Sequence, residues 1–309
     1  MGLYKNYTRN RSVPGSLSQG ALGVVERSIG YLQGGYKDST INSAVQMFST
    51  ITQVGQIVYD TGYQRYYRPG ISGNTTGYFS ISDTVAYNKF SFISGSASSS
   101  FSTALNPSVS VSDLGYTVAW LLVTATPSLV ASIDDWLKLN LTTETPTSQG
   151  NLSANPYGTT RQAMGTSSSG FFCNPNNTSV TALNFNTNAV ATQTVTPIDT
   201  GIQIPCGMSV NDTHGYFVGF VNYNIRLNVS GTTIQSYNAA TSYTYNFGES
   251  HSLTSATHGY MMAGYIDTTG RYGNTQHGLC QSIALATESI TTLPDLVLAQ
   301  SSGQMMEGF

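Results

Sequence analysis

Histidines are the first side chains of this sequence to consider for catalysis or metal binding. His214 and His258 occupy matching places, each after a Thr and before a Gly-Tyr pair, whereas His251 and His277 have no such match. A metal site needs convergent ligands, and neither of the two matching histidines has a His or Cys two or four positions away. We therefore expect His214 and His258 to be turn residues that recur with a structural repeat.

Acid/base and nucleophilic chemistry find little support in the residue pattern. Asp134-Asp135 is the only adjacent acidic pair. In a strand the two side chains would point to opposite faces, which disfavours a shared acid/base site. The chain has no Gly-x-Ser-x-Gly elbow for a nucleophilic Ser and no Asp-x-Asp-x-Asp-Gly calcium loop. The pattern predicts a protein that is not an enzyme and that has no cofactor and no metal.

Tyrosines beside arginines are the strongest binding signal, because both residue types are favoured in interaction hot spots. One such group follows a predicted strand, and a second lies close to the N-terminus. The candidate interface consists of Tyr59, Tyr63, Arg65, Tyr66, Tyr67 and Arg68 in the first group and Tyr4, Tyr7, Arg9 and Arg11 in the second.

Composition predicts which elements must position these residues. Charged residues make up 9% of the 309 residues, against about 25% in a typical domain. Ser, Thr, Asn, Gln and Gly take their place, together with 20 Tyr. Thr, Tyr and Val suit strands, and Gly, Asn and Ser suit turns. We expect an all-β chain of many short strands, and the 11% of aromatic residues argues against disorder.

Charge and hydropathy exclude two classes of partner. The net charge is −3 and the basic residues are scattered, so no nucleic-acid footprint is predicted. No stretch approaches the roughly 20 apolar residues of a membrane-spanning helix. The three cysteines, Cys173, Cys206 and Cys280, lack metal-ligand spacing and are expected to be small buried side chains.

A Gly-aromatic pair recurs along the chain at intervals of 47, 38, 55, 45, 44 and 49 residues. A run with apolar residues on alternate positions, the signature of a strand, follows each pair. The pairs begin at Gly30, Gly77, Gly115, Gly170, Gly215, Gly259 and Gly308. The runs include Phe90–Phe92, Leu137–Leu141, Leu183–Phe185, Tyr243–Phe247 and Ile283–Leu285.

A period of about 45 residues built from strands predicts the blades of a β-propeller, in which neighbouring sheets bury each other's faces. Six intervals predict about six blades of short antiparallel strands. We expect the glycine of each pair on the crowded innermost strand, where backbones approach closely. Gly308-Phe309 would then help to close the ring.

The first repeat carries a family resemblance. Gly30–Tyr36, an aromatic strand with a Gly-Gly doublet, is followed by the strand Ile41–Phe48, and this arrangement resembles a kelch repeat. The turn Arg68-Pro69-Gly70, leading to Gly77-Tyr78-Phe79, also resembles part of a kelch repeat. Degenerate repeats of this kind, with Gly-Tyr-Phe, resemble those in virion proteins of tailed bacteriophages. The resemblance implies a kelch-like propeller attached to a tail, neck or capsid.

The chain divides into an extended arm, residues 1–29, and a propeller, residues 30–309. The arm would serve attachment or ring closure. The resemblance implies a structural or adhesive virion component, present in multiple copies in a symmetric assembly, that contacts other virion proteins or host surface glycans. Two alternatives stay open: a free carbohydrate-binding, lectin-like propeller, and a propeller glycosidase or lyase.

Overall fold

Strands form all of the regular secondary structure that the computed structural model describes, and the described residues contain 28 strands and no helix. The structure describes residues 29–34, 36–37, 40–41, 43–62, 70–80, 86–103, 109–114, 116–123, 135–151, 163–173, 179–194, 206–209, 211–218, 224–230, 233–238, 251–262, 265–266, 275–276, 280–297 and 304–308. The expected all-β class is confirmed.

The described residues form six four-stranded antiparallel sheets, which we call blades 1 to 6, and two small two-stranded sheets. The strands of a blade are named in order from the first, innermost strand to the fourth, outermost one. Blade 1 is β28 (Gln304–Gly308), β1 (Ile29–Gln33), β4 (Ala44–Ser49) and β5 (Val54–Asp60). Blade 2 is β6 (Ile71–Ser72), β7 (Thr76–Ser80), β8 (Ala86–Ser91) and β9 (Ser96–Ser102). Blade 3 is β10 (Val109–Ser112), β11 (Val118–Val123), β12 (Asp135–Asn140) and β13 (Thr145–Asn151).

The remaining blades follow the same order. Blade 4 is β14 (Ala163–Gly165), β15 (Ser169–Cys173), β16 (Ser179–Asn184) and β17 (Val190–Thr194). Blade 5 is β18 (Cys206–Ser209), β19 (His214–Val218), β20 (Asn224–Ser230) and β21 (Thr233–Asn238). Blade 6 is β22 (His251–Thr254), β23 (His258–Met262), β26 (Cys280–Ala284) and β27 (Ile290–Leu293).

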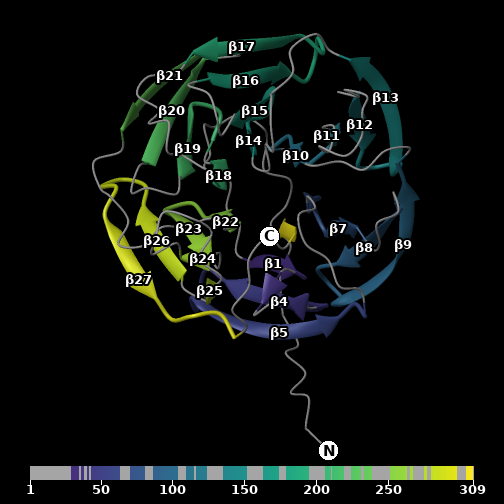
Figure 1. Ribbon diagram of the computed structural model, residues 1–309, viewed down its shortest axis with the longest axis vertical. Coiled ribbons are helices and arrows are strands. Elements are labelled where there is room, and N and C mark those ends of the chain that lie inside the picture. Colours follow the sequence, from purple (N-terminus) through teal and green to yellow (C-terminus); the bar gives the residue numbers. More distant parts are fainter. Residues whose placement is uncertain are drawn as a thin grey trace, which may run out of the picture.

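The blades stand around a central axis as a wheel (Figure 1). The first strands of neighbouring blades contact one another: β6 with β10, β10 with β14, β14 with β18, and β18 with β22. Strand β28 contacts both β22 and β6, which completes the circle. The outermost strands β5, β9, β13, β17, β21 and β27 lie at the rim (Figure 1). The structure is therefore a β-propeller, as the repeat predicts.

The C-terminal strand closes the ring. Strand β28 pairs with β1 in antiparallel register, from Ile29 opposite Gly308 to Gln33 opposite Gln304. The first blade therefore takes its innermost strand from the end of the chain and its other three from the beginning. The expected contribution of the last residues to ring closure is confirmed at Gly308, and the expected arm lies outside the described residues apart from Ile29.

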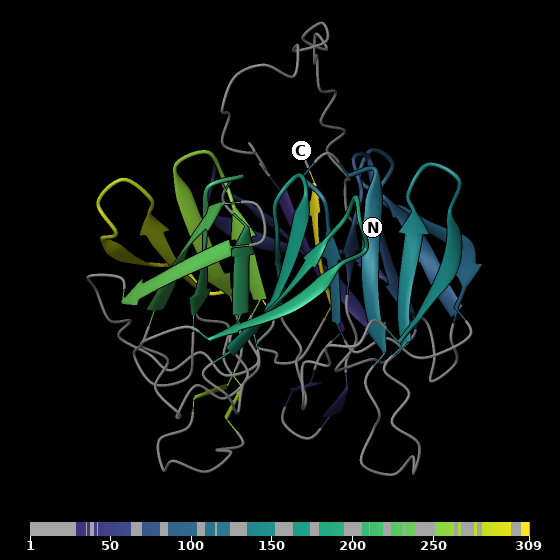
Figure 2. The same cartoon turned by 90° about the horizontal axis from the view of Figure 1, so that it is seen from above.

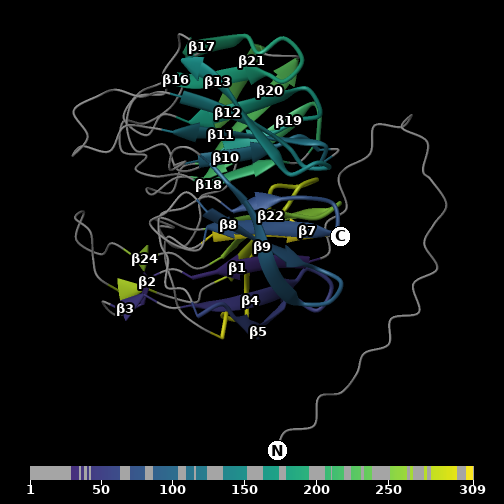
Figure 3. The ribbon, with the colours of Figure 1, turned by 90° about the vertical axis from the view of Figure 1, so that its right-hand side faces the viewer.

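The two faces of the wheel carry different connections. Because the strands of a blade alternate in direction, the turn between its first and second strands and the turn between its third and fourth strands lie on one face. Figure 2 shows the outer hairpin turns gathered there. The opposite face carries two small hairpins, β2 (Tyr36–Lys37) with β3 (Thr40–Ile41) and β24 (Tyr265–Ile266) with β25 (Thr275–Gln276) (Figure 3).

The hydrophobic core lies between blades and not within any one of them. Each of the five buried clusters found among the described side chains draws on two adjacent blades, for example Ile71, Tyr78 and Tyr87 of blade 2 with Leu121 and Leu139 of blade 3. Second strands such as β1 are buried on both faces, whereas the outer strand β9 is largely exposed. This explains the Ser- and Thr-rich composition, because rim strands have no apolar neighbour to cover them.

The Gly-aromatic pairs occupy the second strand of a blade, so the expectation that they lie on the innermost strand is wrong. In blades 1, 2, 4, 5 and 6 the glycine stands opposite an apolar residue of the third strand, as Gly77 does opposite Phe90. Close approach still explains the glycine. At Gly170 an added Cβ would lie 2.7 Å from Val111 Cγ1 of the preceding blade and 3.0 Å from Phe185 Cε1.

Blade 3 departs from the repeat that the sequence suggests. The place of the Gly-aromatic pair is taken there by Ala119 and Trp120, with Ala119 opposite Leu139 and Trp120 opposite Lys138. Tyr116 precedes the strand and its amide donates to the Asp113 carbonyl in the first turn, so the assignment of the Gly115-Tyr116 pair as a repeat copy is wrong, although Gly115 itself lies outside the described residues. Gly308 is on an innermost strand and is likewise no copy of the pair.

Candidate functional site

The turn between the third and fourth strands has the same shape in five blades. One residue of each turn adopts the left-handed conformation with φ between 55° and 65°. Such a backbone is sparsely populated by residues other than Gly and Asn, so the surrounding hairpin must impose it. We call this place the left-handed position, and it is occupied by Gln53, Gly95, Glu144, Asn188 and Glu288.

Side chains that end the third strand hold these turns in shape. Asn140 Oδ1 accepts hydrogen bonds from the backbone amides of Thr142 and Thr143, both at 2.9 Å. Asn184 Oδ1 does the same for the two corresponding amides of blade 4, at 2.9 and 3.0 Å. Local Asn-to-backbone bonding of this kind is the usual reason for Asn in turns. The left-handed residue is thereby presented at a fixed place beside the preceding blade.

Glu144, at the left-handed position of blade 3, reaches back to blade 2. It accepts hydrogen bonds from the Tyr78 hydroxyl at 3.2 Å and from the Ser100 hydroxyl at 2.6 Å. It also forms an ion pair with Lys89, which stands directly opposite Tyr78 in the sheet. Burial raises the pKa of Glu144, but the bonds from Lys89 and Ser100 outweigh it, so the pKa lies below its ordinary value.

The same contact recurs between blades 5 and 6. Glu288, again at the left-handed position, accepts from the Tyr216 hydroxyl at 3.1 Å and from Arg226 Nη1 at 3.3 Å. Arg226 stands opposite Tyr216, as Lys89 stands opposite Tyr78. We call this arrangement of aromatic, opposed cation and left-handed carboxylate the blade latch. It gives the tyrosine of the Gly-Tyr repeat a structural role.

The tyrosine hydroxyl finds a partner in the next turn even where no carboxylate is present. Tyr31 donates to the Phe92 carbonyl at 3.5 Å, between blades 1 and 2. Tyr260 donates to the Thr50 carbonyl at 3.3 Å, between blades 6 and 1. Four junctions of the wheel therefore use the repeated tyrosine to tie one blade to the outer turn of the next.

The junction between blades 3 and 4 has the cation but not the carboxylate. Lys138 stands opposite Trp120, and its Nζ lies 5.2 Å from the centre of the Trp120 ring. The ammonium donates to the carbonyl of Phe185 at 3.3 Å. The left-handed residue of blade 4 is Asn188, and its amide donates to Gln149 Oε1 at 2.9 Å instead. No described carboxylate pairs with Lys138.

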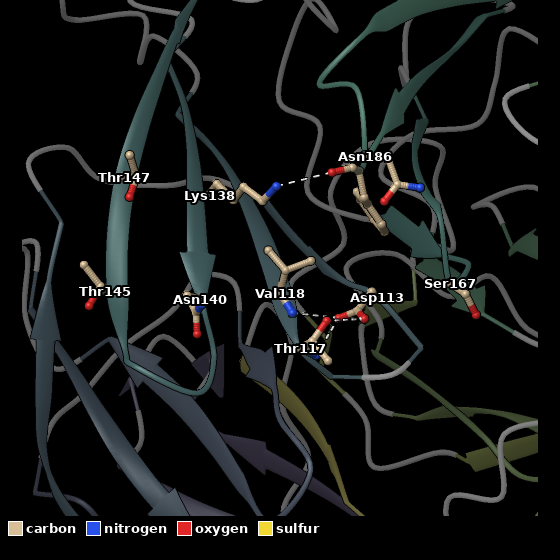
Figure 4. A pocket seen from close by; sticks show the side chains of 10 residues that line it. Asp113, Thr117, Val118, Lys138, Asn140, Thr145, Thr147, Ser167 and Asn186 are labelled. Atoms are coloured by element: carbon tan, nitrogen blue, oxygen red, sulfur yellow. Dashed lines mark hydrogen bonds between the residues drawn. The ribbon is translucent and has the colours of Figure 1, made fainter. Parts of the chain in front are cut away.

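A groove of about 470 Å³ opens beside Lys138, between blades 3 and 4. Figure 4 shows Lys138 extending from β12 across this groove toward the turn that holds Asn186, with Thr145 and Thr147 on β13 at its other side. Hydroxyl and amide groups dominate the lining. The lining residues are Asp113, Thr117, Val118, Lys138, Asn140, Thr145, Thr147, Ser167, Phe185 and Asn186.

Asp113 is the second charged residue of the groove, and its carboxylate is occupied by its own turn. Oδ1 accepts from the backbone amides of Thr117 and Val118, both at 2.8 Å, and Oδ2 accepts from the Thr117 hydroxyl at 2.8 Å. A carboxylate with three donors on it caps its own turn and has its acceptor positions already in use. The groove can therefore bind polar groups, with Lys138 as its available charge.

The two matching histidines begin the second strands β19 and β23, where each carbonyl closes the first-to-second-strand turn. His214 Nδ1 lies 3.3 Å from the Thr213 hydroxyl, and its backbone amide donates to Asn211 Oδ1 at 3.0 Å. His258 repeats this with the Thr257 hydroxyl at 2.8 Å and Ser255 Oγ at 3.1 Å. Partial burial, followed by the nearby Arg226 guanidinium, lowers the pKa of His214. The described residues contain no group of three or more His, Cys, Asp or Glu placed to hold a metal.

Most of the predicted interface falls outside the described residues. Tyr4, Tyr7, Arg9, Arg11, Tyr63, Arg65, Tyr66, Tyr67 and Arg68 all lie outside them, as do Asp134 and Tyr243–Phe247. Tyr59 is described: it is half-buried on β5 and packs against Phe90 of blade 2, with ring centres 6.0 Å apart. Tyr59 therefore joins two blades.

Sequence reasoning did not single out Lys138, although a signal was present. Leu137-Lys138-Leu139 places one cation between apolar residues of a strand, as Arg226 lies between Ile225 and Leu227. Cys280 is buried, as expected; the side chains of Cys173 and Cys206 are not among those described. Within the described ranges, no helix has the length and apolar character needed to cross a membrane.

Comparisons with known proteins support the fold. No protein-family model matches the chain, and no curated protein matches its sequence. Among solved structures, the chain is similar to one from the crystal structure of a nidogen/laminin complex, with a TM-score of 0.58 and 7% sequence identity. The match covers 91% of this chain and 98% of the other. At that identity the likeness concerns the fold alone, and by fold the chain is a β-propeller.

Proposed function

We propose that this protein is a structural and adhesive component of the virion of a tailed bacteriophage. In this proposal a kelch-like propeller docks on the tail, neck or capsid in multiple copies and contacts other virion proteins or host surface glycans. The location in a virion is inferred from the resemblance of the Gly-Tyr-Phe repeats such as Gly77–Phe79 to those of phage proteins. A role as an enzyme is not part of the proposal.

The observation that carries the binding role is the groove between blades 3 and 4. Its walls are hairpins whose turns are fixed by Asn140, Asn184 and Asp113, so its hydroxyl and amide groups are held before any ligand arrives. Preorganised polar groups lower the entropy cost of binding. The blade latches support the structural role, because ion pairs and buried aromatic side chains join separate blades into one wheel.

The groove also favours the second candidate function, a free carbohydrate-binding propeller. Sugars are recognised through hydroxyl and amide partners, and the groove presents several of each. The two candidates differ in where the protein is found. A virion component is a fixed constituent of particles, whereas a free lectin is absent from them.

Particle composition and a deletion test the proposal. Quantitative mass spectrometry of purified particles should find the chain at a fixed number of copies per particle. Deletion of residues 1–28, which leaves β1 and the ring closure intact, should preserve the circular dichroism spectrum and abolish incorporation. Particles without the full-length chain would refute the virion assignment. Incorporation of the deleted chain at the normal copy number would show that the arm is not the attachment.

A further inference from the structure

Among the described residues, three blades carry a cation directly opposite the repeated aromatic residue, and one of the three cations lacks an internal anion. Lys89 has Glu144 and Arg226 has Glu288, each supplied by the left-handed position of the next blade. Lys138 faces a turn whose left-handed residue is an amide. The same architecture that neutralises two cations therefore leaves the third without a described carboxylate.

The local environment holds the Lys138 ammonium in place without neutralising it. The ammonium has three N–H donors, and one of them donates to the Phe185 carbonyl. The Trp120 ring offers a cation–π contact. Both partners are neutral, so the positive charge persists at the wall of the groove. A carboxylate arriving there would make the charge-assisted bond that Glu144 makes to Lys89.

We propose that the groove between blades 3 and 4 binds a carboxylate-bearing saccharide, with its carboxylate on Lys138. This inference rests on the proposed adhesive function and specifies the class of glycan. The carboxylate takes the place that Glu144 and Glu288 take in the blade latches. The exposed side chains of Thr147 and Asn186 hydrogen-bond to the sugar hydroxyls.

The dimensions and charge of the groove select this ligand class. A volume of about 470 Å³ lies within the 300–1,000 Å³ typical of small-molecule sites. One cation suits one carboxylate. The Asp113 carboxylate lines the same groove, so a phosphate dianion would meet repulsion that a monoanion meets less. The lining offers hydroxyl and amide partners for the remainder of the sugar.

Calorimetric titration of the purified full chain tests the ligand class. The probes are D-glucuronate and N-acetylneuraminate as acidic sugars, the methyl ester of glucuronate as a neutral match, and acetate as a carboxylate without a sugar. Glucuronate should bind at least tenfold more tightly than its ester and than acetate. Lys138→Gln should weaken glucuronate at least tenfold and leave the ester unchanged.

A second variant tests the mechanism without removing the lysine. Asn188→Glu places a carboxylate at the left-handed position, where Glu144 and Glu288 show that Glu fits with φ of 55° and 56°. The new side chain should pair with Lys138 and weaken glucuronate at least tenfold. Gln53→Glu makes the same change at the left-handed position of blade 1 and should leave binding within twofold.

The outcomes separate this inference from the proposed function. No binding of either acidic sugar, equal affinity for the neutral ester, or unchanged affinity in both Lys138→Gln and Asn188→Glu would each overturn the inference. Incorporation into particles is measured independently. Particles that carry Lys138→Gln at the normal copy number and adsorb normally to cells would overturn the saccharide role while leaving the virion assignment in place.

Discussion

The blade latch at Glu144 predicts a measurable loss of stability when the carboxylate is removed. Glu144→Ala deletes the acceptor for Lys89, Ser100 and Tyr78. A hydrogen bond to a charged group contributes about 1.5–3 kcal/mol. The Glu144 and Lys89 side chains are 26% and 36% exposed, so solvent screening reduces the ion pair to roughly 1 kcal/mol. The buried Tyr78 hydroxyl keeps only its bond to Thr76, and the loss of its bond to Glu144 adds about 1 kcal/mol.

We therefore expect Glu144→Ala to lower the free energy of unfolding by about 2–3 kcal/mol. Urea denaturation monitored by tryptophan fluorescence measures it. Gln53→Ala is the matched control, because Gln53 has the same φ of 55° and its side chain hydrogen-bonds to no described residue. Both variants place Ala in a left-handed backbone, so the difference between them isolates the latch. Equal destabilisation by the two variants would refute the latch.

The contribution of the Glu144 charge is tested by comparing the stability of the wild type and of Glu144→Gln as a function of pH. The pKa of Glu144 is lowered from 4.5, so its contribution is complete above that value and is lost as pH falls through the pKa of the folded state. The pKa of Lys89 is raised from 10.5, chiefly by its bond to Glu144, so its contribution is complete below that value and is lost at higher pH. The stability gap between wild type and Glu144→Gln, about 1 kcal/mol at neutral pH, should vanish in acid. A gap that persists unchanged at pH 3 contradicts this.

Three further changes test the wheel. Deleting 304–309 removes β28 and leaves β1 with an open edge, so the chain should lose several degrees of thermal stability and aggregate in light scattering. Gly165→Ala would place a Cβ 2.3 Å from the Ser112 carbonyl oxygen and should cost about 1–3 kcal/mol in urea titrations, whereas Gly95→Asn, with nothing within 4 Å, should be tolerated. Asn211→Ala removes the acceptor of two turn amides and should cost about 1 kcal/mol in the same assay.

The sequence predicts the fold well because the residues that recur in it have the same packing role in successive blades. A glycine recurs where the second strand meets the neighbouring blade, as Gly170 does at Val111, and an aromatic residue follows because it must reach the next turn. The position within the blade could not be inferred, because crowding occurs on the second strand as well as on the first. The spacing identified six units without identifying which strand carried the signal.

Blade 3 shows where sequence periodicity fails. Its first turn spans Asp113 to Val118, closed by a bond from the Asp113 amide to the Val118 carbonyl, whereas the turn of blade 4 is closed from Thr166 to Ser169. The longer turn shifts the strand along the sequence, and Tyr116, which bonds to Asp113 within the turn, imitates the aromatic residue of the repeat. The candidate site could not be predicted for the same reason, because the sequence does not give the strand register of blade 3. Lys138 is informative only when its register with Trp120 is known.

The junction at which the opposed cation, Lys138, has no described carboxylate is also the junction with the largest aromatic side chains, and the two facts are connected. Both tryptophans of the chain lie there, fully buried. Trp120 stacks on Phe185 with ring centres 6.4 Å apart, and Trp136 meets the edge of Phe172 at 5.1 Å. Aromatic burial and pairing contribute without any ion pair. Blades 3 and 4 can therefore stay joined while the Lys138 charge remains available to a ligand, which a junction dependent on its ion pair could not allow.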